Sequence, residues 1–197
     1  MSLRLKLLLG VGTAALAFAV FAAVAWNTVE TTKVNGDAYA GIVEGKDLVA
    51  DVLPPPEYIV ESYLVAYQIA DAATPAAVAP LADRLRALRD EHVKRHDFWR
   101  ESSLDGRLRT LMMEDAFRPA EQFFAVAESE LVPAATRGDE QRVAAIMRNR
   151  LEPLFAQHRK AIDEVVTLAN EHLAADERAV AGLLRARATW LTVLAVL

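Results

Sequence analysis

The chain has 197 residues, of which 53% are hydrophobic and 25% are charged, and its net charge is −5. That length suffices for one ordinary domain, and the scarcity of Gly and Pro, eight of each, favours helix. The negative charge gives nucleic-acid binding no electrostatic support. The absence of Cys excludes disulfides, thiolate zinc sites and covalently attached c-type haem.

An apolar segment at the N-terminus predicts a membrane anchor. Arg4 and Lys6 precede an apolar run from Leu7 to Trp26, whose roughly 20 residues would span about 30 Å as a helix. A cleaved signal peptide is the competing interpretation, because small residues precede Trp26. The run is longer than a typical signal core, so we expect residues 1–26 to form an uncleaved transmembrane helix. The basic flank places the N-terminus in the cytoplasm and the chain after Trp26 outside it.

The C-terminal residues repeat the apolar pattern. Residues 188–197 are too few to cross a bilayer, and we expect them to be the truncated start of a second transmembrane helix. Trp190 would lie near the interface, and Arg185 and Arg187 would extend toward lipid head groups. Residues 27–187 then form one extracytoplasmic domain.

Helix-breaking residues divide this domain into four helical stretches. Breaks are predicted at Pro54–Pro56, Asp71–Pro75, Ser102–Gly106 and Thr136–Asp139. The predicted helices are the stretch from the membrane to Ala70, interrupted at the triple proline, then Pro75–Arg100, Gly106–Ala135, and Asp139–Arg187, which continues into the membrane.

Apolar periodicity shows how these helices pack. Residues recur at spacings of three and four in the second and fourth stretches, for example Leu85, Leu88, His92, His96 and Trp99. Each such stripe needs partner helices to bury it, so we predict an all-α, up-down-up-down four-helix bundle with long first and fourth helices. At the helical rise the outer helices measure about 65–75 Å and the middle pair about 40–45 Å. The loop at Ser102–Gly106 should therefore lie level with residues 46–56.

Three segments resemble the periplasmic sensor region of methyl-accepting chemotaxis proteins. They are residues 45–64 (GKDLVADVLPPPEYIVESYL), 95–99 (RHDFW) and 158–166 (HRKAIDEVV). The triple proline is the specific part of this resemblance. The resemblance implies a bacterial inner-membrane chemoreceptor with its sensor domain in the periplasm. Such receptors continue into a HAMP linker and a cytoplasmic signalling rod, and neither is present in this sequence. The same input domain also fits a histidine kinase or a diguanylate cyclase.

Counting residues from the helix turns brings distant polar residues to one depth in the bundle. This layer would form a ligand pocket. Its Arg and His side chains would bind a carboxylate through charge-assisted hydrogen bonds, and Trp99 and Tyr58 would line the pocket. The competing interpretation is a salt-bridge layer that only fixes the register of the helices. The candidate ligand-binding residues are Lys46, Asp47, Asp51, Tyr58, Arg95, His96, Trp99, Arg118, His158 and Arg159.

Two other interpretations concern the histidines and the prolines. His92 and His96 have the spacing of a metal or noncovalent haem site, and His158 faces inward at a similar depth. Single inward histidines are more often hydrogen-bonded core residues, so we expect no metal and no cofactor. The triple proline equally fits a simple bend of the first helix around the bundle.

The sequence predicts a receptor and not an enzyme, because no P-loop, GxGxxG, GxSxG or HExxH motif occurs. A small molecule would bind outside the cytoplasm and shift the fourth helix relative to the first by an ångström or two. We expect a homodimer in the inner membrane and no nucleic-acid partner. The alternatives are a membrane-anchored haem- or metal-binding bundle and a structural adaptor without a ligand.

Overall fold

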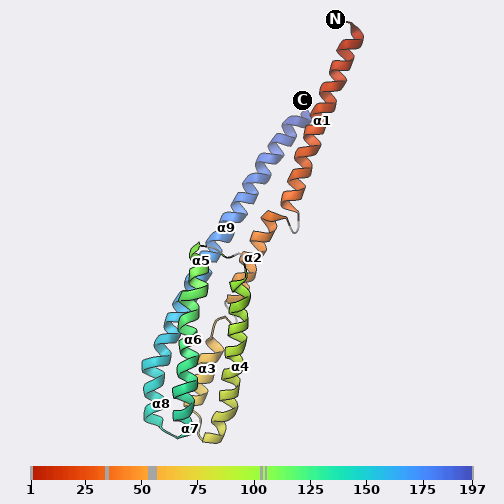
Figure 1. The fold of residues 1–197 in the computed structure, drawn as a ribbon. Coiled ribbons are helices and arrows are strands. Elements are labelled where there is room, and N and C mark those ends of the chain that lie inside the picture. The colour runs from red at the N-terminus through yellow and green to blue at the C-terminus, as the bar shows by residue number, and fades with distance from the viewer. Residues whose placement is uncertain (1, 34–35, 53–56, 103, 105, 197) are drawn as a thin grey trace. The chain divides into compact units, whose positions relative to one another are not determined.

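The structure is a computed structural model that describes residues 2–33, 36–52, 57–102, 104 and 106–196. Side chains of residues 37–41, 44, 194 and 196 lie outside the description. The described residues form helices joined by short turns, with no strand among them, which confirms the all-α prediction (Figure 1). The predicted bend at Pro54–Pro56 falls outside the described residues.

The chain divides into two compact units. The terminal unit comprises Met1–Lys46 and Glu171–Leu197, and the central unit comprises Asp47–Asn170. Helix α9 (Glu152–Val196) contributes residues to both units as one uninterrupted helix. The prediction of three segments at 1–26, 27–187 and 188–197 therefore differs in its boundaries from this division into units.

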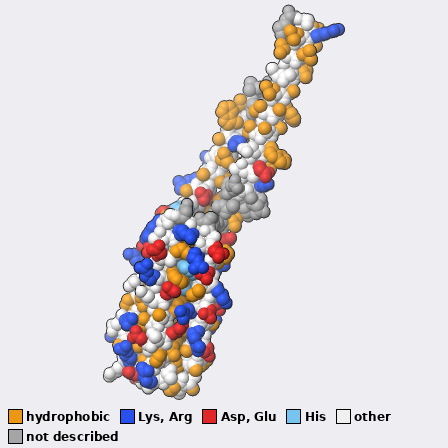
Figure 2. Space-filling view, in the orientation of Figure 1, with side chains coloured by type: hydrophobic (Ala, Val, Ile, Leu, Met, Phe, Trp, Pro, Cys, Tyr) orange, Lys and Arg blue, Asp and Glu red, His pale blue; other side chains and the backbone are white. Residues whose placement is uncertain are grey.

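Helix α1 (Leu3–Thr32) is the apolar helix of the terminal unit. Its best 18-residue window has a mean hydropathy of 2.4, and none of it is buried, so hydrophobic side chains cover its surface in Figure 2. Among the described residues α1 is the one helix long and apolar enough to cross a membrane. The predicted second membrane segment at 188–197 lies within α9, which stays helical to Val196.

The predicted first stretch is three separate helices. After α1 come α2 (Asp37–Val52) and α3 (Val60–Ala70). The break between α1 and α2, which the prediction missed, follows from Gly36. A Cβ atom at Gly36 would lie 2.7 Å from the Thr31 carbonyl oxygen, so the turn accepts only glycine without a backbone shift.

The predicted second stretch is α4 (Pro75–Arg100), as expected. The third and fourth stretches contain short π-helical segments that the sequence did not indicate. The third runs through α5 (Gly106–Thr110), η1 (Leu111–Ala116), α6 (Phe117–Val126), η2 (Ala127–Leu131) and α7 (Val132–Thr136). The fourth runs through α8 (Glu140–Ile146), η3 (Met147–Leu151) and α9. A π-helical turn changes the rotational phase of the side chains that follow it.

The central unit buries apolar side chains in two clusters. One contains Ile69, Leu85, Phe123 and Leu151 and joins α3 and α4 to α6 and η3. In Figure 1 these elements run side by side. The stripe predicted on α4 is buried from Leu85 through Trp99, which confirms the predicted inward face of this helix.

The second cluster contains Leu48, Val52, Trp99, Leu104 and Ile162. Leu104 lies in the loop after α4, and Leu48 and Val52 lie on α2. Their membership in one buried cluster agrees with the prediction that this loop lies near α2.

Candidate functional site

His158 lies at the centre of the central unit and is completely buried. Its Nδ1 lies 2.9 Å from the Ala116 carbonyl oxygen, and its Nε2 accepts a hydrogen bond from the Ile59 N–H at 3.4 Å. A ring that donates through Nδ1 and accepts through Nε2 is the neutral imidazole. Burial agrees with this state, because it lowers the pKa of His158 to about 4.

Glu57 is a buried carboxyl group beside two histidines. It is 4% exposed, and its Oε2 lies 3.9 Å from Nδ1 of His92. Burial raises the pKa of Glu57 to about 8, so its carboxyl group is protonated at neutral pH. Its Oε1 has no hydrogen-bond partner within the described part of the chain. The His92 ring lies 6.2 Å from that of His158, so the three side chains form one buried polar cluster.

His96 extends this cluster along α4. Its ring stacks on Phe117 with 3.6 Å between centroids, and the same Phe117 ring stacks on His92 at 5.5 Å. Desolvation lowers the pKa of His96, so this ring also favours the neutral state. The cluster Glu57, His92, His96 and His158 is called the histidine cluster below.

A second group, on α2 and α4, surrounds Trp99. Trp99 is 2% exposed, and its Nε1 has no hydrogen-bond partner among the residues described. The Arg95 guanidinium forms an ion pair with Asp51 and lies 5.6 Å from the Trp99 ring centroid. Because Arg95 and Asp51 are both half-buried, the pair is partly shielded from solvent.

The predicted layer is therefore only partly assembled. Tyr58 joins the histidine cluster, because its ring stacks on His158 at 6.0 Å. Asp51, Arg95 and Trp99 form the second group. Asp47, Arg118 and Arg159 are exposed, and Lys46 belongs to the terminal unit.

Local geometry explains why Arg159 and Lys46 are exposed. Arg159 follows the inward-facing His158 by one residue, a rotation of about 100° on a helix, so it faces solvent and lies 3.8 Å from Asp163 on its own helix. Lys46 lies 3.7 Å from Glu177, also within the terminal unit. Placing Arg159 on the inward face with His158 was wrong, because a depth count does not fix rotation about the helix axis.

Aromatic rings connect the histidine cluster to the far end of the central unit. Tyr58 stacks on Phe155 at 5.9 Å, and Phe155 stacks on Tyr63 at 4.0 Å. Tyr63 meets Tyr67 edge-on at 5.0 Å. This row of rings lies along the seam between α3 and α9 and is called the aromatic seam below.

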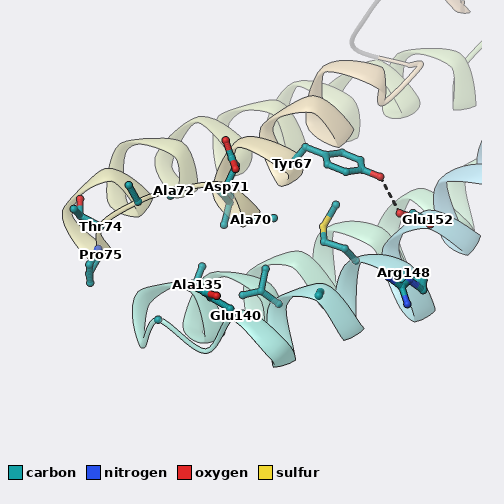
Figure 3. Close-up of a pocket in the computed structure, with 16 residues that line it drawn as sticks. Tyr67, Ala70, Asp71, Ala72, Thr74, Pro75, Ala135, Glu140, Arg148 and Glu152 are labelled. Carbon is teal, nitrogen blue, oxygen red and sulfur yellow. Dashed lines mark hydrogen bonds between the residues drawn. The ribbon is translucent and has the colours of Figure 1, made fainter.

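The aromatic seam ends at an open pocket that sequence reasoning missed. The pocket has a volume of about 570 Å³ and lies between the α3–α4 turn and the α7–α8 turn (Figure 3). Tyr67 reaches across it and donates a hydrogen bond to Glu152 Oε1 at 2.8 Å. Sequence reasoning also missed Glu57, because the residues around it follow a run of prolines and show no helical periodicity. No sequence signal marks the pocket, since it is a gap between helices and not a motif.

The hydrogen bonds of His158 bear on the alternative of a metal site. His158 uses both ring nitrogens for backbone hydrogen bonds, so it has no lone pair free for a metal ion. No group of three or more potential ligands gathers around a common point in the described residues.

Comparison with known protein families, curated proteins and solved structures found no match to this chain. The resemblance to methyl-accepting chemotaxis proteins therefore rests on the three sequence segments, and the triple proline lies outside the described residues.

Proposed function

We propose that this chain is the extracytoplasmic sensor region of a membrane-anchored receptor of the chemoreceptor type. Helix α1 would be its anchor in a bacterial inner membrane, and the central unit would be an up-down-up-down four-helix bundle in the periplasm that binds a small molecule. The signalling module would follow α9 and would be that of a chemoreceptor, a histidine kinase or a diguanylate cyclase.

The observation that carries this proposal is the continuity of α9. This helix holds His158 in the buried core of the central unit and continues without a break into the terminal unit. A helix is stiff along its axis, so a small displacement at one end is carried to the other. Helix shifts of about 1–2 Å are a common form of signalling movement.

The aromatic seam is the surface along which α9 would move. Stacked rings make a smooth interface compared with interdigitated aliphatic side chains. Tyr63 and Phe155 are only partly buried, and Tyr67 is exposed. Tyr67 and Glu152 connect the two helices by a hydrogen bond at the pocket. A ligand there would act directly on the α3–α9 contact.

The receptor is proposed to be a homodimer. On α3 the side chains of Val60 and Leu64 lie one helical turn apart and are 40% and 56% exposed. An isologous contact of this face with a second copy would bury apolar area on both. Anchoring in one membrane would hold the two copies parallel.

The proposal is tested by combining a binding screen with a distance measurement. The full chain in lipid nanodiscs is screened by thermal shift against a panel of carboxylates, amines and sugars. Spin labels are attached to cysteines at Gln68 on α3 and Gln157 on α9, both exposed and in a chain without native Cys. A compound that raises the melting temperature should change the label distance by about 1–2 Å. Binding that leaves this distance unchanged would contradict transmission through α9.

A further inference from the structure

The pocket at the end of the aromatic seam has the dimensions and lining of a small-molecule site. Its volume of about 570 Å³ falls within the range of roughly 300–1,000 Å³ that is usual for ligand pockets. Ile69, Val143 and Met147 give it an apolar lining, and Tyr67 gives it an aromatic wall. These residues come from α3, α8 and η3, so helical segments far apart in the sequence form the site.

The charged groups around this pocket are mainly acidic. Glu140 and Glu152 lie on its α8–α9 side, and Asp71 caps α3 on the opposite side. In Figure 3 the Asp71 carboxylate points away from the α7–α8 side, so it adds only to the negative potential. Arg148 is the one basic residue of the lining, and its guanidinium points away from Tyr67.

The carboxylates of Glu140 and Glu152 supply hydrogen-bond acceptors in the lining. Glu152 keeps one carboxylate oxygen beyond the one that accepts from Tyr67, and a carboxylate has about four acceptor positions in all. Tyr67 adds an aromatic face, which attracts cations through its quadrupole. A ligand suited to these groups carries ammonium donors on a short apolar chain.

We propose that this pocket binds an organic cation of the diamine class. One ammonium group would bind Glu152 beside the Tyr67 ring, the hydrocarbon chain would cover Val143 and Met147, and the second ammonium group would approach Glu140. This ligand differs from the carboxylate expected at Arg95 and His158. The inference deepens the proposed sensor function, on which its meaning for signalling rests.

Isothermal titration calorimetry on the full chain tests this ligand class. The chain is held in nanodiscs of zwitterionic phosphatidylcholine, which does not attract cations, and is titrated with 1,4-diaminobutane at low ionic strength. Succinate and 1,4-butanediol have the same carbon chain with opposite charge and with none. We expect each to bind at least about ten-fold more weakly than the diamine, because neither supplies charge-assisted donors.

Two conservative variants locate the binding site. Glu152→Gln and Glu140→Gln each remove one carboxylate and should weaken diamine binding by about ten-fold. Glu171→Gln is the matched control, because it removes the same charge from an exposed position on α9 and should leave the affinity unchanged. The thermal melting curve of each variant establishes that it is folded, and two variants keep the test valid if one of them unfolds.

Three outcomes would overturn the inference. They are absence of diamine binding, equal binding of the diol, and unchanged affinity in both pocket variants. Different results would contradict the proposed sensor function. Another compound that binds and moves α9 would preserve that function without the diamine, whereas diamine binding without movement of α9 would preserve the site and contradict the function.

Discussion

Replacing His158 with alanine is expected to lower the free energy of unfolding by about 3–5 kcal/mol. The side chain is completely buried, so its removal leaves a cavity between α9 and its neighbours. The Ala116 carbonyl and the Ile59 N–H would also lose their partner inside the core. A buried polar group without a partner costs about 1–3 kcal/mol, which is why the loss should exceed that of an ordinary surface substitution.

The matched control for this variant is His172→Ala. His172 lies on the same helix and is exposed, so its replacement should change stability by about 0.5 kcal/mol or less. Urea unfolding followed by circular dichroism, in the same detergent for both variants, gives the comparison. Equal losses for the two variants would show that His158 does not hold α9 to η1 and α3.

Replacing Glu57 with glutamine is expected to flatten the dependence of stability on pH. The pKa of Glu57 is about 8 in the folded chain, against an ordinary value of 4.5. The unfolded chain therefore releases this proton at lower pH than the folded chain does. The contribution of Glu57 to stability is highest below pH 4.5, falls as the pH rises, and is lowest above pH 8, by an amount on the order of 5 kcal/mol. The glutamine side chain stays neutral throughout and avoids this loss.

The pH dependence of stability that arises from His158 has the opposite sign and covers a different pH range. Its pKa is lowered from 6.5 to about 4, so its contribution to stability is lost as the pH falls through this interval. The interval between 6.5 and 8 therefore isolates Glu57. In it, the stability advantage of Glu57→Gln over the native chain should grow with pH, and Glu171→Gln should show no such trend. A constant difference across this interval would contradict the buried, protonated state of Glu57.

Local sequence pattern was sufficient to predict which faces of α4 and α9 point inward. The spacing of Leu85, Leu88, His92, His96 and Trp99 places them on one side of a helix, and all five are buried. The pattern is reliable there because α4 is regular from Pro75 to Arg100.

The same reasoning failed for the composition of the polar layer. Counting residues from a turn gives depth along the axis and not rotation around it. The π-helical segments η1 and η3 add a further change of phase before Arg118 and Arg159. Glu57 was not recognised as a site residue because its burial depends on packing against α4 and not on a pattern in its own segment.

The pocket at Tyr67 depends on packing alone. Tyr67 lies far from Glu140 and Glu152 in the sequence, and no local spacing relates it to them. Their proximity follows from how the α3–α4 turn and the α7–α8 turn separate at the end of the central unit. Such gaps between helices can be found only once the helices are placed together.

The most direct test of the proposed receptor is the side of the membrane on which the central unit lies. Because the chain has no Cys, single cysteines at Ser2 and Gln68 are unique labelling sites, and both positions are exposed. Intact bacterial spheroplasts are treated with a membrane-impermeant maleimide, and lysed spheroplasts serve as the control. We expect labelling at position 68 in intact spheroplasts and at position 2 only after lysis. Labelling at position 68 only after lysis would place the central unit in the cytoplasm and contradict an extracytoplasmic sensor.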